Sequence, residues 1–361
     1  MATSPQKTAT LSDVAALAGI GLATASRALN GKGYMSQKTR DAALKAAKEL
    51  NFQPNLHARS LVQGRSHNTV ALLSNYDLGV LSRQGFFITH RMEELGFEVQ
   101  SHTIPRWIHK SEAKQVALVD KVRRQLPGAI ICGSLVPEAV QELLLFIQAG
   151  GAVTSYGEKL DLECDQVPFD FSHRAYLATR HLLELGHRDI GFCFHGKVGQ
   201  DSTELAGFSR AMEEFGAPIQ NDWLFMGGNY EEGGASLAEA FLSWPKKPTG
   251  MCIVNDVSAL VFVTMLARNG LRVPDDVSVV GFDDSPIANY ALVPLTCVNY
   301  PLEAIGRHVV ELTQSRLKGY DGAPRTVVVQ SELIPRSSTA PYRRKGHPKG
   351  RSLTRSTSVS L

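Results

Sequence analysis

Residues 10–61 decide the fold of the first part of the chain, and they read TLSDVAALAGIGLATASRALNGKGYMSQKTRDAALKAAKELNFQPNLHARSL. Ser12 is expected to cap a first helix, and Gly19 ends it where a positive φ costs little. A second short helix is expected over residues 22–29, with alanines that let the two helices lie close together. Two short helices joined by a glycine turn are typical of a helix-turn-helix, whose second helix can enter a DNA major groove.

A third helix is expected over residues 37–51, with Ser36 as its N-cap. Its apolar positions repeat at helical spacing and are expected to cover a three-helix core. The pattern alone leaves two interpretations open, because a small helical subdomain without any ligand has the same spacing. The residues expected to form this cover are Ala43, Leu44, Ala47 and Leu50.

The runs LSDVAALAG, LATASRALNG, S-x-K-T-R and FQPNLHARSL resemble the headpiece of the lactose-repressor family of bacterial transcription regulators. In this family a serine that caps the recognition helix and contacts a phosphate usually stands where this chain has Gly21, so a weaker cap and a weaker contact to the DNA backbone are expected. Leu22 and Ala23 fall on base-reading positions and are apolar, which leaves Arg27 as the main polar reader of bases. The resemblance implies DNA contacts from Leu22, Ala23, Thr24, Ser26, Arg27, Asn30, Tyr34, Ser36 and Thr39.

Pro54 prevents the third helix from continuing, and Asn55 can cap a short new helix after it. The resemblance implies that two such hinge helices of a homodimer pack in the DNA minor groove. Leu61 would then be wedged between base pairs, with Ala58 one turn before it, as in other proteins that kink DNA. The alternative is a linker in which Leu61 packs against the body of the protein.

Charge is distributed unevenly along the 361 residues, although the net charge is only +3. Residues 1–66 hold nine Lys/Arg against three Asp/Glu, and residues 341–361 hold six Lys/Arg and no acid. The remaining central part therefore carries a net charge of −9. A basic end attached to an acidic body is typical of a module that binds a polyanion such as DNA.

The five cysteines are far apart and show no metal-ligand spacing, so no metal site and no cofactor are expected. Cys132, Cys193 and Cys252 fall within expected strands and are interpreted as small buried hydrophobic residues. No apolar signal core or membrane-spanning run is present in the sequence, which predicts a cytoplasmic protein. The resemblance to bacterial DNA-binding regulators implies that it is bacterial and associated with the nucleoid.

Residues 68–339 alternate short apolar strands with helical stretches, which predicts parallel sheets covered by helices on both faces. The runs HLLELGHRDIGF, RVPDDVSVVGFDDSPIANYALVPLT and ELIPRSST resemble the body of the same family. The resemblance implies a periplasmic-binding-protein-like (type I) body of two doubly wound α/β lobes, following an all-α helix-turn-helix headpiece with a hinge helix. Crossovers between the lobes are expected near Asp170, near residues 294–297 and around Val328.

These patterns predict a headpiece over residues 1–54, a hinge over 55–66 and a two-lobed body over 67–340. The first lobe is expected to span about 67–168 and 298–327, and the second about 169–297 and 328–340. Residues 341–361 are rich in Pro, Gly, Ser and Arg without heptads, which predicts a disordered basic tail.

The effector pocket is expected beyond the carboxyl ends of the strands. Family members have an effector-binding arginine three residues before Gly-Phe, but this chain has Glu204 there. Carboxylates gathered in one cleft raise each other's pKa unless a cation or hydroxyl donors offset them. The ligand is therefore expected to be either a neutral sugar or polyol, which we prefer, or a cationic amine. The resemblance, with the local sequence, implies ligand contacts from Asn75, Asp77, Phe169, Glu204, Tyr230, Asn255 and Asp283.

The sequence contains no glycine-rich phosphate loop, no G-x-S-x-G elbow and no HExxH, so no enzymatic activity is expected. Asp283 and Asp284 are adjacent at a strand end and point in different directions, and Asp284 is expected to cap the next helix. The resemblance implies a homodimeric transcription regulator, of the repressor type, that binds a pseudo-palindromic operator and responds to a small effector. A regulator that responds to a partner protein is the alternative, and a solute-binding protein is a weaker one.

Overall fold

The computed structural model describes residues 11–29, 35–50, 66–74, 80–104, 111–194, 202–227 and 230–343. The chain divides into two compact units, residues 1–68 and 69–361. None of the helices among the described residues is long and apolar enough to cross a membrane.

The first unit contains three helices, α1 (Leu11–Ala18), α2 (Leu22–Leu29) and α3 (Gln37–Glu49). Gly19 ends α1 with φ 64°, as its position predicts. The helices approach closely because their shared core is built from small side chains. The buried residues of this core are Val14, Ala15, Ala25, Ala28, Ala43 and Ala46.

Three details of the headpiece differ from the sequence predictions. Ser12 lies inside α1, which already begins at Leu11, so it is not the N-cap. Helix α3 ends at Glu49 rather than at residue 51. Leu44 is 50% exposed, because the turn of α3 directs Ala43 and Ala46 toward the other two helices instead. The predicted cap of α3 is confirmed, since Ser36 Oγ accepts the backbone N–H of Thr39 at 3.2 Å.

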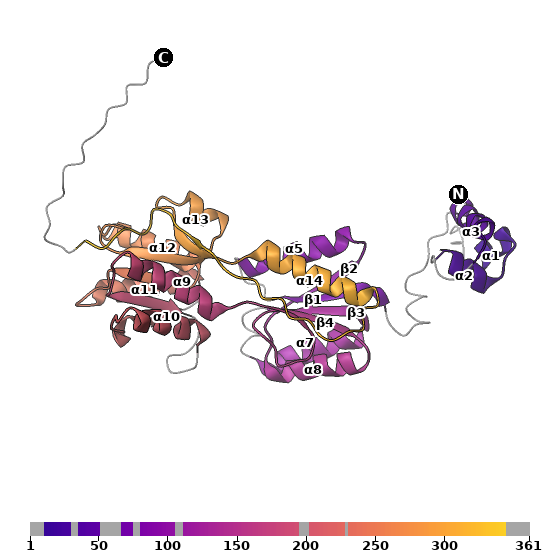
Figure 1. The fold of residues 1–361 in the computed structure, drawn as a ribbon, viewed down its shortest axis with the longest axis horizontal. Helices are drawn as coiled ribbons and strands as arrows, with labels where there is room; N and C mark the ends of the chain where they lie inside the picture. Colours follow the sequence, from indigo (N-terminus) through magenta and orange to yellow (C-terminus); the bar gives the residue numbers. More distant parts are fainter. Residues whose placement is uncertain are drawn as a thin grey trace, which may run out of the picture. The chain divides into compact units, whose positions relative to one another are not determined.

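The first lobe of the body is a five-stranded sheet with the order β2-β1-β3-β4-β5. Helices α5 and α14 cover one face of this sheet, and α7 and α8 cover the other (Figure 1). Its strands are rich in buried aliphatic residues, as expected for a sheet covered on both faces. The elements are β1 (Ser66–Ser74), α5 (Val80–Glu94), β2 (Glu98–Thr103), α7 (Glu112–Arg124), β3 (Pro127–Cys132), α8 (Pro137–Gln148), β4 (Ala152–Gly157), β5 (Asp165–Pro168) and α14 (Leu302–Leu317).

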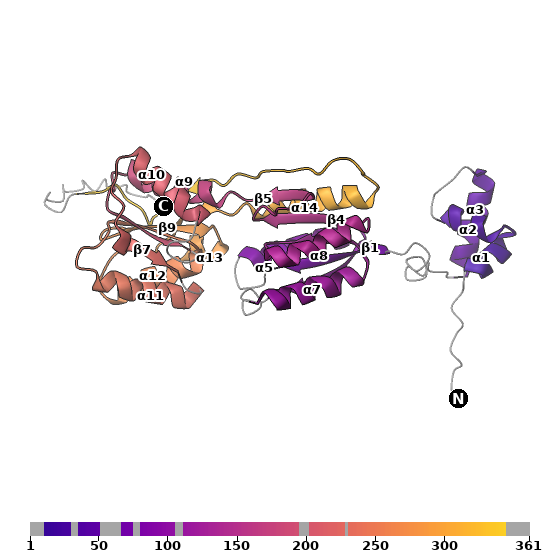
Figure 2. The same ribbon diagram turned by 90° about the horizontal axis from the view of Figure 1, so that it is seen from below.

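The second lobe is a six-stranded sheet with the order β11-β10-β9-β8-β6-β7, in which only β11 is antiparallel to its neighbour among the described pairs. Helices α9 and α10 lie on one face, and α11 and α12 lie on the other (Figure 2). The elements are α9 (Phe171–Glu184), β6 (Ile190–Phe194), α10 (Thr203–Glu214), the 3-10 turn η1 (Asn221–Trp223), β7 (Leu224–Met226), α11 (Tyr230–Ser243), β8 (Gly250–Ile253), α12 (Asp256–Arg268), β9 (Ser278–Asp283), α13 (Pro286–Tyr290), β10 (Thr296–Asn299) and β11 (Leu333–Ile334). The predicted fold class, a helical headpiece followed by a two-lobed α/β body, is confirmed.

Three segments connect the lobes, at residues 169–170, 300–301 and 318–332. The second connecting segment was expected near residues 294–297. It lies after Asn299 instead, because β10 pairs in parallel with β9 and therefore belongs to the second lobe. The third runs beside the edge strand β5 and forms single bridges from Gln166 to Thr326 and from Phe169 to Val329. Its position agrees with the expectation of a crossover around Val328.

All five cysteines are free and buried, which confirms the prediction made for Cys132, Cys193 and Cys252. Burial raises the pKa of Cys193 and of Cys252 to about 12, so these thiols stay protonated. Residues 341–343, which were assigned to the predicted tail, are placed against the second lobe. The Tyr342 N–H donates to the Leu185 carbonyl at 2.8 Å, and its ring packs beside His187. Residues 344–361 of the predicted tail lie outside the described residues.

Candidate functional site

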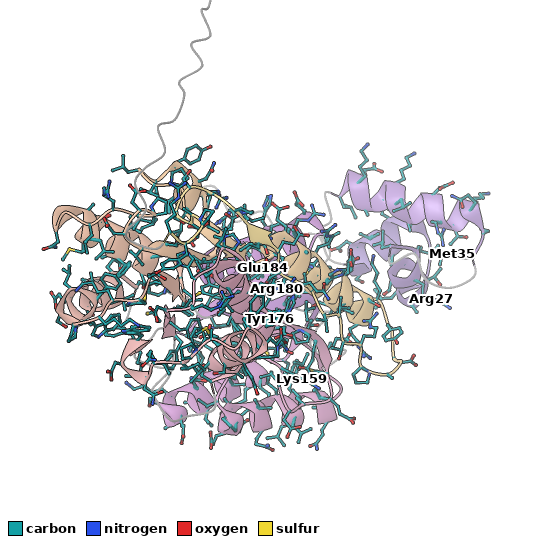
Figure 3. The ribbon with its side chains drawn as sticks, turned by 60° about the vertical axis from the view of Figure 1, so that its left-hand side comes forward. Arg27, Met35, Lys159, Tyr176, Arg180 and Glu184 are labelled. Atoms are coloured by element: carbon teal, nitrogen blue, oxygen red, sulfur yellow. The ribbon has the colours of Figure 1, made fainter. Side chains whose placement is uncertain are left out.

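The helix predicted to read DNA presents the expected side chains on one face. In α2, Ala25 and Ala28 are buried in the headpiece, whereas Ala23 and Arg27 are exposed and Leu22 is 55% exposed. Thr24 and Ser26 are half-buried at the edges of this face. Arg27 lies on the outside of the headpiece (Figure 3), and its Nε donates to the Ala23 carbonyl at 3.3 Å. The exposed face is mainly apolar with one guanidinium.

Two further predicted DNA contacts lie at the start of α3. Ser36 and Thr39 are linked through their hydroxyls at 2.8 Å, and Ser36 Oγ also caps the helix. This pair fixes the first turn of α3, where free backbone N–H groups attract an anion such as a phosphate. The other predicted contacts, Asn30, Tyr34, Asn55, Ala58 and Leu61, lie outside the described residues.

A cavity of about 140 Å³ lies between the two lobes of the body. Its walls are formed where strands of both sheets end, as expected for ligand sites in parallel α/β sheets. Gly133 and Ser134 follow β3, while Asn255 and Asp283 lie at the ends of β8 and β9. The lining residues are Val80, Leu81, Gly133, Ser134, Tyr156, Gly157, Phe171, Arg174, Glu204, Tyr230, Val254, Asn255, Asp283 and Tyr300.

A buried ion cluster forms the second-lobe wall of the cavity. Arg174 of α9 donates from Nη1 to Asp283 Oδ1 at 2.9 Å and from Nη2 to Glu204 Oε1 at 3.4 Å. Glu204 and Asp283 were expected to lie together here, whereas Arg174 was missed. Glu204 is buried. The arginine that family members have at this position is absent, and Arg174 of the neighbouring helix α9 supplies a positive charge instead.

The close approach of α9 and α10 makes this ion cluster possible. Gly207 lies one turn after Glu204, and a Cβ there would meet the Ser172 carbonyl oxygen at 1.9 Å. Only glycine allows the two helix backbones to touch at this point. Because Ser172 precedes Arg174 by two residues, this contact brings the guanidinium and the Glu204 carboxylate to the same place.

Aromatic rings surround the Arg174 guanidinium, which lies 5.3 Å from the Phe169 ring centroid, 5.4 Å from that of Phe171 and 4.8 Å from that of Phe282. Such contacts stabilise a partly desolvated cation. Phe169 was predicted to pack on the ligand, but it lies behind the wall against Phe171 and Tyr300. Phe171 lines the cavity in place of Phe169, together with the rings of Tyr156, Tyr230 and Tyr300.

Three buried donors on the cavity wall have no hydrogen-bond partner among the described residues. They are Arg174 Nε, Asn255 Nδ2 and Tyr300 Oη, and the three residues are only 3–5% exposed. Asn255 Oδ1 caps α12 by accepting the Ser258 N–H at 2.8 Å, which fixes the direction of the Nδ2 group. Buried donors normally have partners, and these three belong to residues that line one cavity, which makes the cavity a candidate place for a molecule with hydrogen-bond acceptors.

The backbone at the end of β9 is strained. Asp283 and Asp284 have φ of 98° and 55°, a region that costs a non-glycine residue about 1–3 kcal/mol. This conformation directs Asp283 to Arg174 and Asp284 to Arg336, whose Nη2 lies 2.5 Å from Asp284 Oδ1. The expectation that Asp284 caps the next helix is wrong, because the N-cap of α13 is Ser285.

Asp256 was not predicted as part of the site, but it lies directly behind the cavity. Its Oδ2 accepts the Ser285 N–H at 2.6 Å and the Ser285 hydroxyl at 2.7 Å, and its Oδ1 accepts from the Cys297 thiol. Burial, with the nearby charge of Asp283, raises the pKa of Asp256 to about 7. The carboxyl group is therefore poised between its neutral and ionised forms near neutral pH.

The remaining predicted ligand residues are placed as follows. Tyr230 lines the cavity at the start of α11, and its carbonyl accepts the Ser258 hydroxyl at 2.7 Å. Asn75 and Asp77 lie outside the described residues, so their predicted contacts stay predictions. Arg83 is exposed on α5 and is not part of the lining.

The fold and the cavity define a class of protein: a helix-turn-helix unit joined to a two-lobed binding body. Residues 10–55 match the family described as bacterial regulatory proteins, lacI family, and residues 179–339 match the periplasmic binding protein-like domain. The chain is 31% identical to the transcriptional regulator DegA of Bacillus subtilis over 340 residues, covering 92% of this chain and 98% of DegA. The chain belongs to the lacI family and is a DNA-binding transcription regulator, not an enzyme.

Two further similarities cover almost the whole length of the relatives. The transcriptional repressor PurR of Vibrio parahaemolyticus is 29% identical over 338 residues, covering 91% of this chain and 98% of PurR. The solved complex of the transcriptional regulator CelR with cellobiose is 28% identical, with a TM-score of 0.66, and covers 91% of this chain and 99% of that one. These relatives include a protein that was solved with a sugar.

Proposed function

We propose that this regulator is a homodimeric repressor whose affinity for a pseudo-palindromic operator is controlled by a neutral, hydroxyl-rich small molecule in the cavity between the lobes. The observation that carries this proposal is the mixture of groups on the cavity wall. Arg174, Asn255 and Tyr300 offer buried donors, and Glu204 and Asp283 offer acceptors in the same small space. A hydroxyl group both donates and accepts, so a sugar or polyol matches such a wall.

The size of the cavity supports a small ligand. Its volume of about 140 Å³ is close to that of an engineered cavity of about 150 Å³ that holds one benzene molecule. A single six-membered ring is therefore a better match than two linked rings in this lobe arrangement. The complex of a relative with the disaccharide cellobiose supports a sugar-like ligand, while the small cavity of this chain favours a monosaccharide.

In this proposal, residues 1–54 form the headpiece and residues 55–66 form the hinge. Leu61 of the hinge is wedged between base pairs in the minor groove. Arg27 reads a base edge in the major groove, while Thr24, Ser26, Ser36 and Thr39 contact phosphates. Leu22 and Ala23 touch thymine methyl groups. The protein acts in the cytoplasm, bound to the nucleoid.

The test combines operator selection with ligand binding, both on the full-length protein. An operator is first selected from random duplexes, and its affinity is then measured with and without each member of a panel of monosaccharides, polyols and sugar phosphates. We expect one neutral sugar or polyol to change the operator affinity by a factor of about 5–150, the usual range of coupling between two sites. A panel in which only a sugar phosphate acts, or in which nothing binds the cavity while a partner protein changes DNA binding, would contradict the proposal.

A further inference from the structure

The ion cluster on the second-lobe wall contains an arginine on an unexpected helix. Arg174 sits in the first turns of α9, close to the positive end of the helix dipole, where a cation is normally unfavourable. It is nevertheless only 4% exposed. A buried cation in such a place needs strong compensation, and Asp283 and Glu204 supply it through direct ion pairs.

We propose that Arg174 is the specificity-determining residue of the effector cavity. It neutralises one of the two negative charges of the acidic wall and pairs with both carboxylates, so that the cavity admits neutral ligands and rejects cationic amines. This inference rests on the proposed function, because it concerns the same cavity. It also decides between the two ligand types that the sequence leaves open, a neutral sugar and a cationic amine.

The charges of the described lining explain why a cationic ligand is excluded. The wall holds one guanidinium between two carboxylates, and both contacts are short enough for direct ion pairing. An amine ligand would have to displace the guanidinium from Asp283 or Glu204 and leave it buried among Phe169, Phe171 and Phe282. Leaving a buried charge without its partner is strongly unfavourable, so the internal cation outcompetes an external one.

The hydrogen bonds of Arg174 explain how the cavity can bind a neutral ligand. Nη1 and Nη2 of Arg174 are engaged by the two carboxylates, but Nε is buried without a partner among the described residues. Nε can therefore donate to a ligand oxygen while the guanidinium stays in place. A hydrogen bond from a charged donor contributes about 1.5–3 kcal/mol, which corresponds to a factor of about 10–150 in affinity.

The first experiment uses chemical rescue, so that it does not depend on knowing the effector. Arg174→Ala removes the guanidinium and leaves a hole beside the two carboxylates. We expect methylguanidinium chloride to raise the melting temperature of the full-length Arg174→Ala protein in a saturable manner, relative to equal sodium chloride. The matched control is Arg180→Ala on the exposed face of the same helix, where Arg180 lies near Tyr176 and Glu184 (Figure 3).

The second experiment compares neutral monosaccharides with their amino-sugar counterparts by calorimetry. Wild type should prefer the neutral sugar, and Arg174→Gln should lose at least about tenfold in affinity for it and gain affinity for the amino sugar. Arg174→Gln/Glu204→Gln restores the net charge of the wall, so its preference for the amino sugar should disappear again. Arg180→Gln should behave as wild type in both titrations.

The outcomes separate the two proposals. If wild type binds no sugar but methylguanidinium selectively stabilises Arg174→Ala, the role of Arg174 stands and the sugar proposal fails. If methylguanidinium affects Arg174→Ala and Arg180→Ala equally, or if wild type binds amino sugars as tightly as Arg174→Gln does, Arg174 is not the specificity residue. A folded Arg174→Gln protein that binds the neutral sugar as wild type does would also overturn the inference.

Discussion

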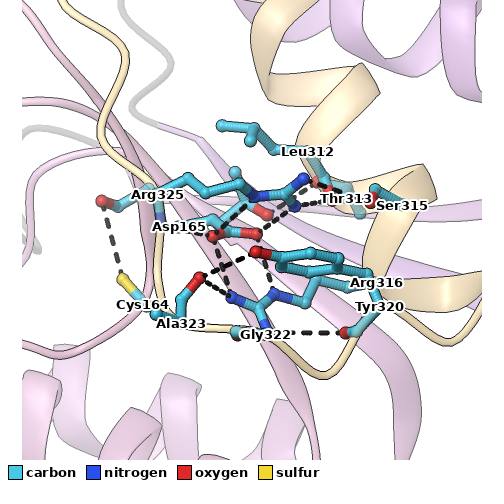
Figure 4. Close-up of polar contacts among 12 residues, drawn as sticks. Cys164, Asp165, Leu312, Thr313, Ser315, Arg316, Tyr320, Gly322, Ala323 and Arg325 are labelled. Atoms are coloured by element: carbon cyan, nitrogen blue, oxygen red, sulfur yellow. Dashed lines mark hydrogen bonds and ion pairs between the residues drawn. The ribbon is translucent and has the colours of Figure 1, made fainter.

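Asp165 at the start of β5 offers the most direct test of how the lobes are connected. Its buried carboxylate accepts from Arg316 Nε at 2.9 Å and Nη2 at 3.0 Å, and from Arg325 Nη2 at 2.7 Å and the Arg325 backbone N–H at 2.8 Å (Figure 4). The Tyr320 ring packs against both guanidinium groups. These contacts fix the third connecting segment on the first lobe.

The expected effect of Asp165→Asn follows from these contacts. Removing one partner of a buried ion cluster costs about 3–5 kcal/mol. The lower end applies to Asp165, because the Arg316 and Arg325 side chains are 17% and 31% exposed and also donate to other oxygens. A loss of about 3 kcal/mol corresponds to a melting temperature lower by roughly 6–12 °C in a domain of this size.

The pH range of the measurement also follows from the site. Burial alone raises the pKa of Asp165, but hydrogen bonds from Arg316 and Arg325 outweigh it and lower the pKa below the ordinary value of 3.8. A carboxyl group with a lowered folded-state pKa stabilises the fold above its unfolded-state value and loses this contribution as the pH falls through the folded-state value. The difference between wild type and Asp165→Asn is therefore complete at pH 7 and shrinks only below about pH 4.

The assay is thermal unfolding at pH 7, combined with hydrogen exchange of the connecting segment. The amide of Val327 donates to the Gln166 carbonyl at 2.9 Å, and we expect its exchange to accelerate in Asp165→Asn together with that of Arg325. Asp120→Asn is the matched control, because Asp120 also pairs with two arginines but its side chain is 28% exposed, whereas that of Asp165 is fully buried. Equal melting temperatures and unchanged exchange in Asp165→Asn would refute the reasoning.

Two further predictions concern the DNA-reading helix and the acid behind the cavity. Arg27→Ala should weaken specific operator binding by about 1–3 kcal/mol and relax sequence preference, and an unchanged ratio of specific to non-specific affinity in fluorescence anisotropy would exclude this role. Asp256→Asn should remove a pH dependence. Because the folded-state pKa of about 7 exceeds the ordinary 3.8, the unfolded chain ionises at lower pH than the folded protein, and wild-type stability falls by about 3 kcal/mol between pH 5 and 8. Urea unfolding that shows the same slope in both proteins would contradict this.

The parts of the structure that depend on local sequence could be predicted. Ser36 caps α3 through the residue three positions later, and Gly19 ends α1 through its own backbone freedom, so both are visible in the sequence. The alternation of apolar strands and helices predicted the parallel sheets covered by helices for the same reason, whereas the two-lobed arrangement was implied by the family resemblance. Leu44 was placed wrongly, because a shift of one position around a helix decides between a buried and an exposed side chain.

The cavity wall could be predicted only in part, because its contacts join distant residues. Arg174 and Asp283 are 109 positions apart, and no periodic pattern connects them. One local signal was present, a basic residue in the first turns of a helix capped by Asp170, where the helix dipole disfavours a cation. The left-handed backbone of Asp283 and Asp284 had no signal, because neither position is a glycine.

The division of the cavity wall between the lobes determines how an effector can act. Arg174, Glu204 and Asp283 all belong to the second lobe, so the ion cluster offers a ligand the same contacts whatever the arrangement of the lobes. A ligand shifts a conformational equilibrium only by binding one arrangement more tightly. The differential contacts must therefore come from the first lobe and its connections, where Ser134 and Tyr156 line the cavity.

Substitutions on the two walls should consequently have different effects on the proposed regulation. Asp283→Asn should weaken effector binding with and without operator by a similar factor, because the contact is common to both arrangements. Ser134→Ala should instead reduce the factor by which the effector changes operator affinity, since linkage makes this factor equal to the ratio of effector affinities. Measuring effector affinity with and without operator for both variants separates the two roles, and a loss of coupling in Asp283→Asn alone would show that the signal arises within the second lobe.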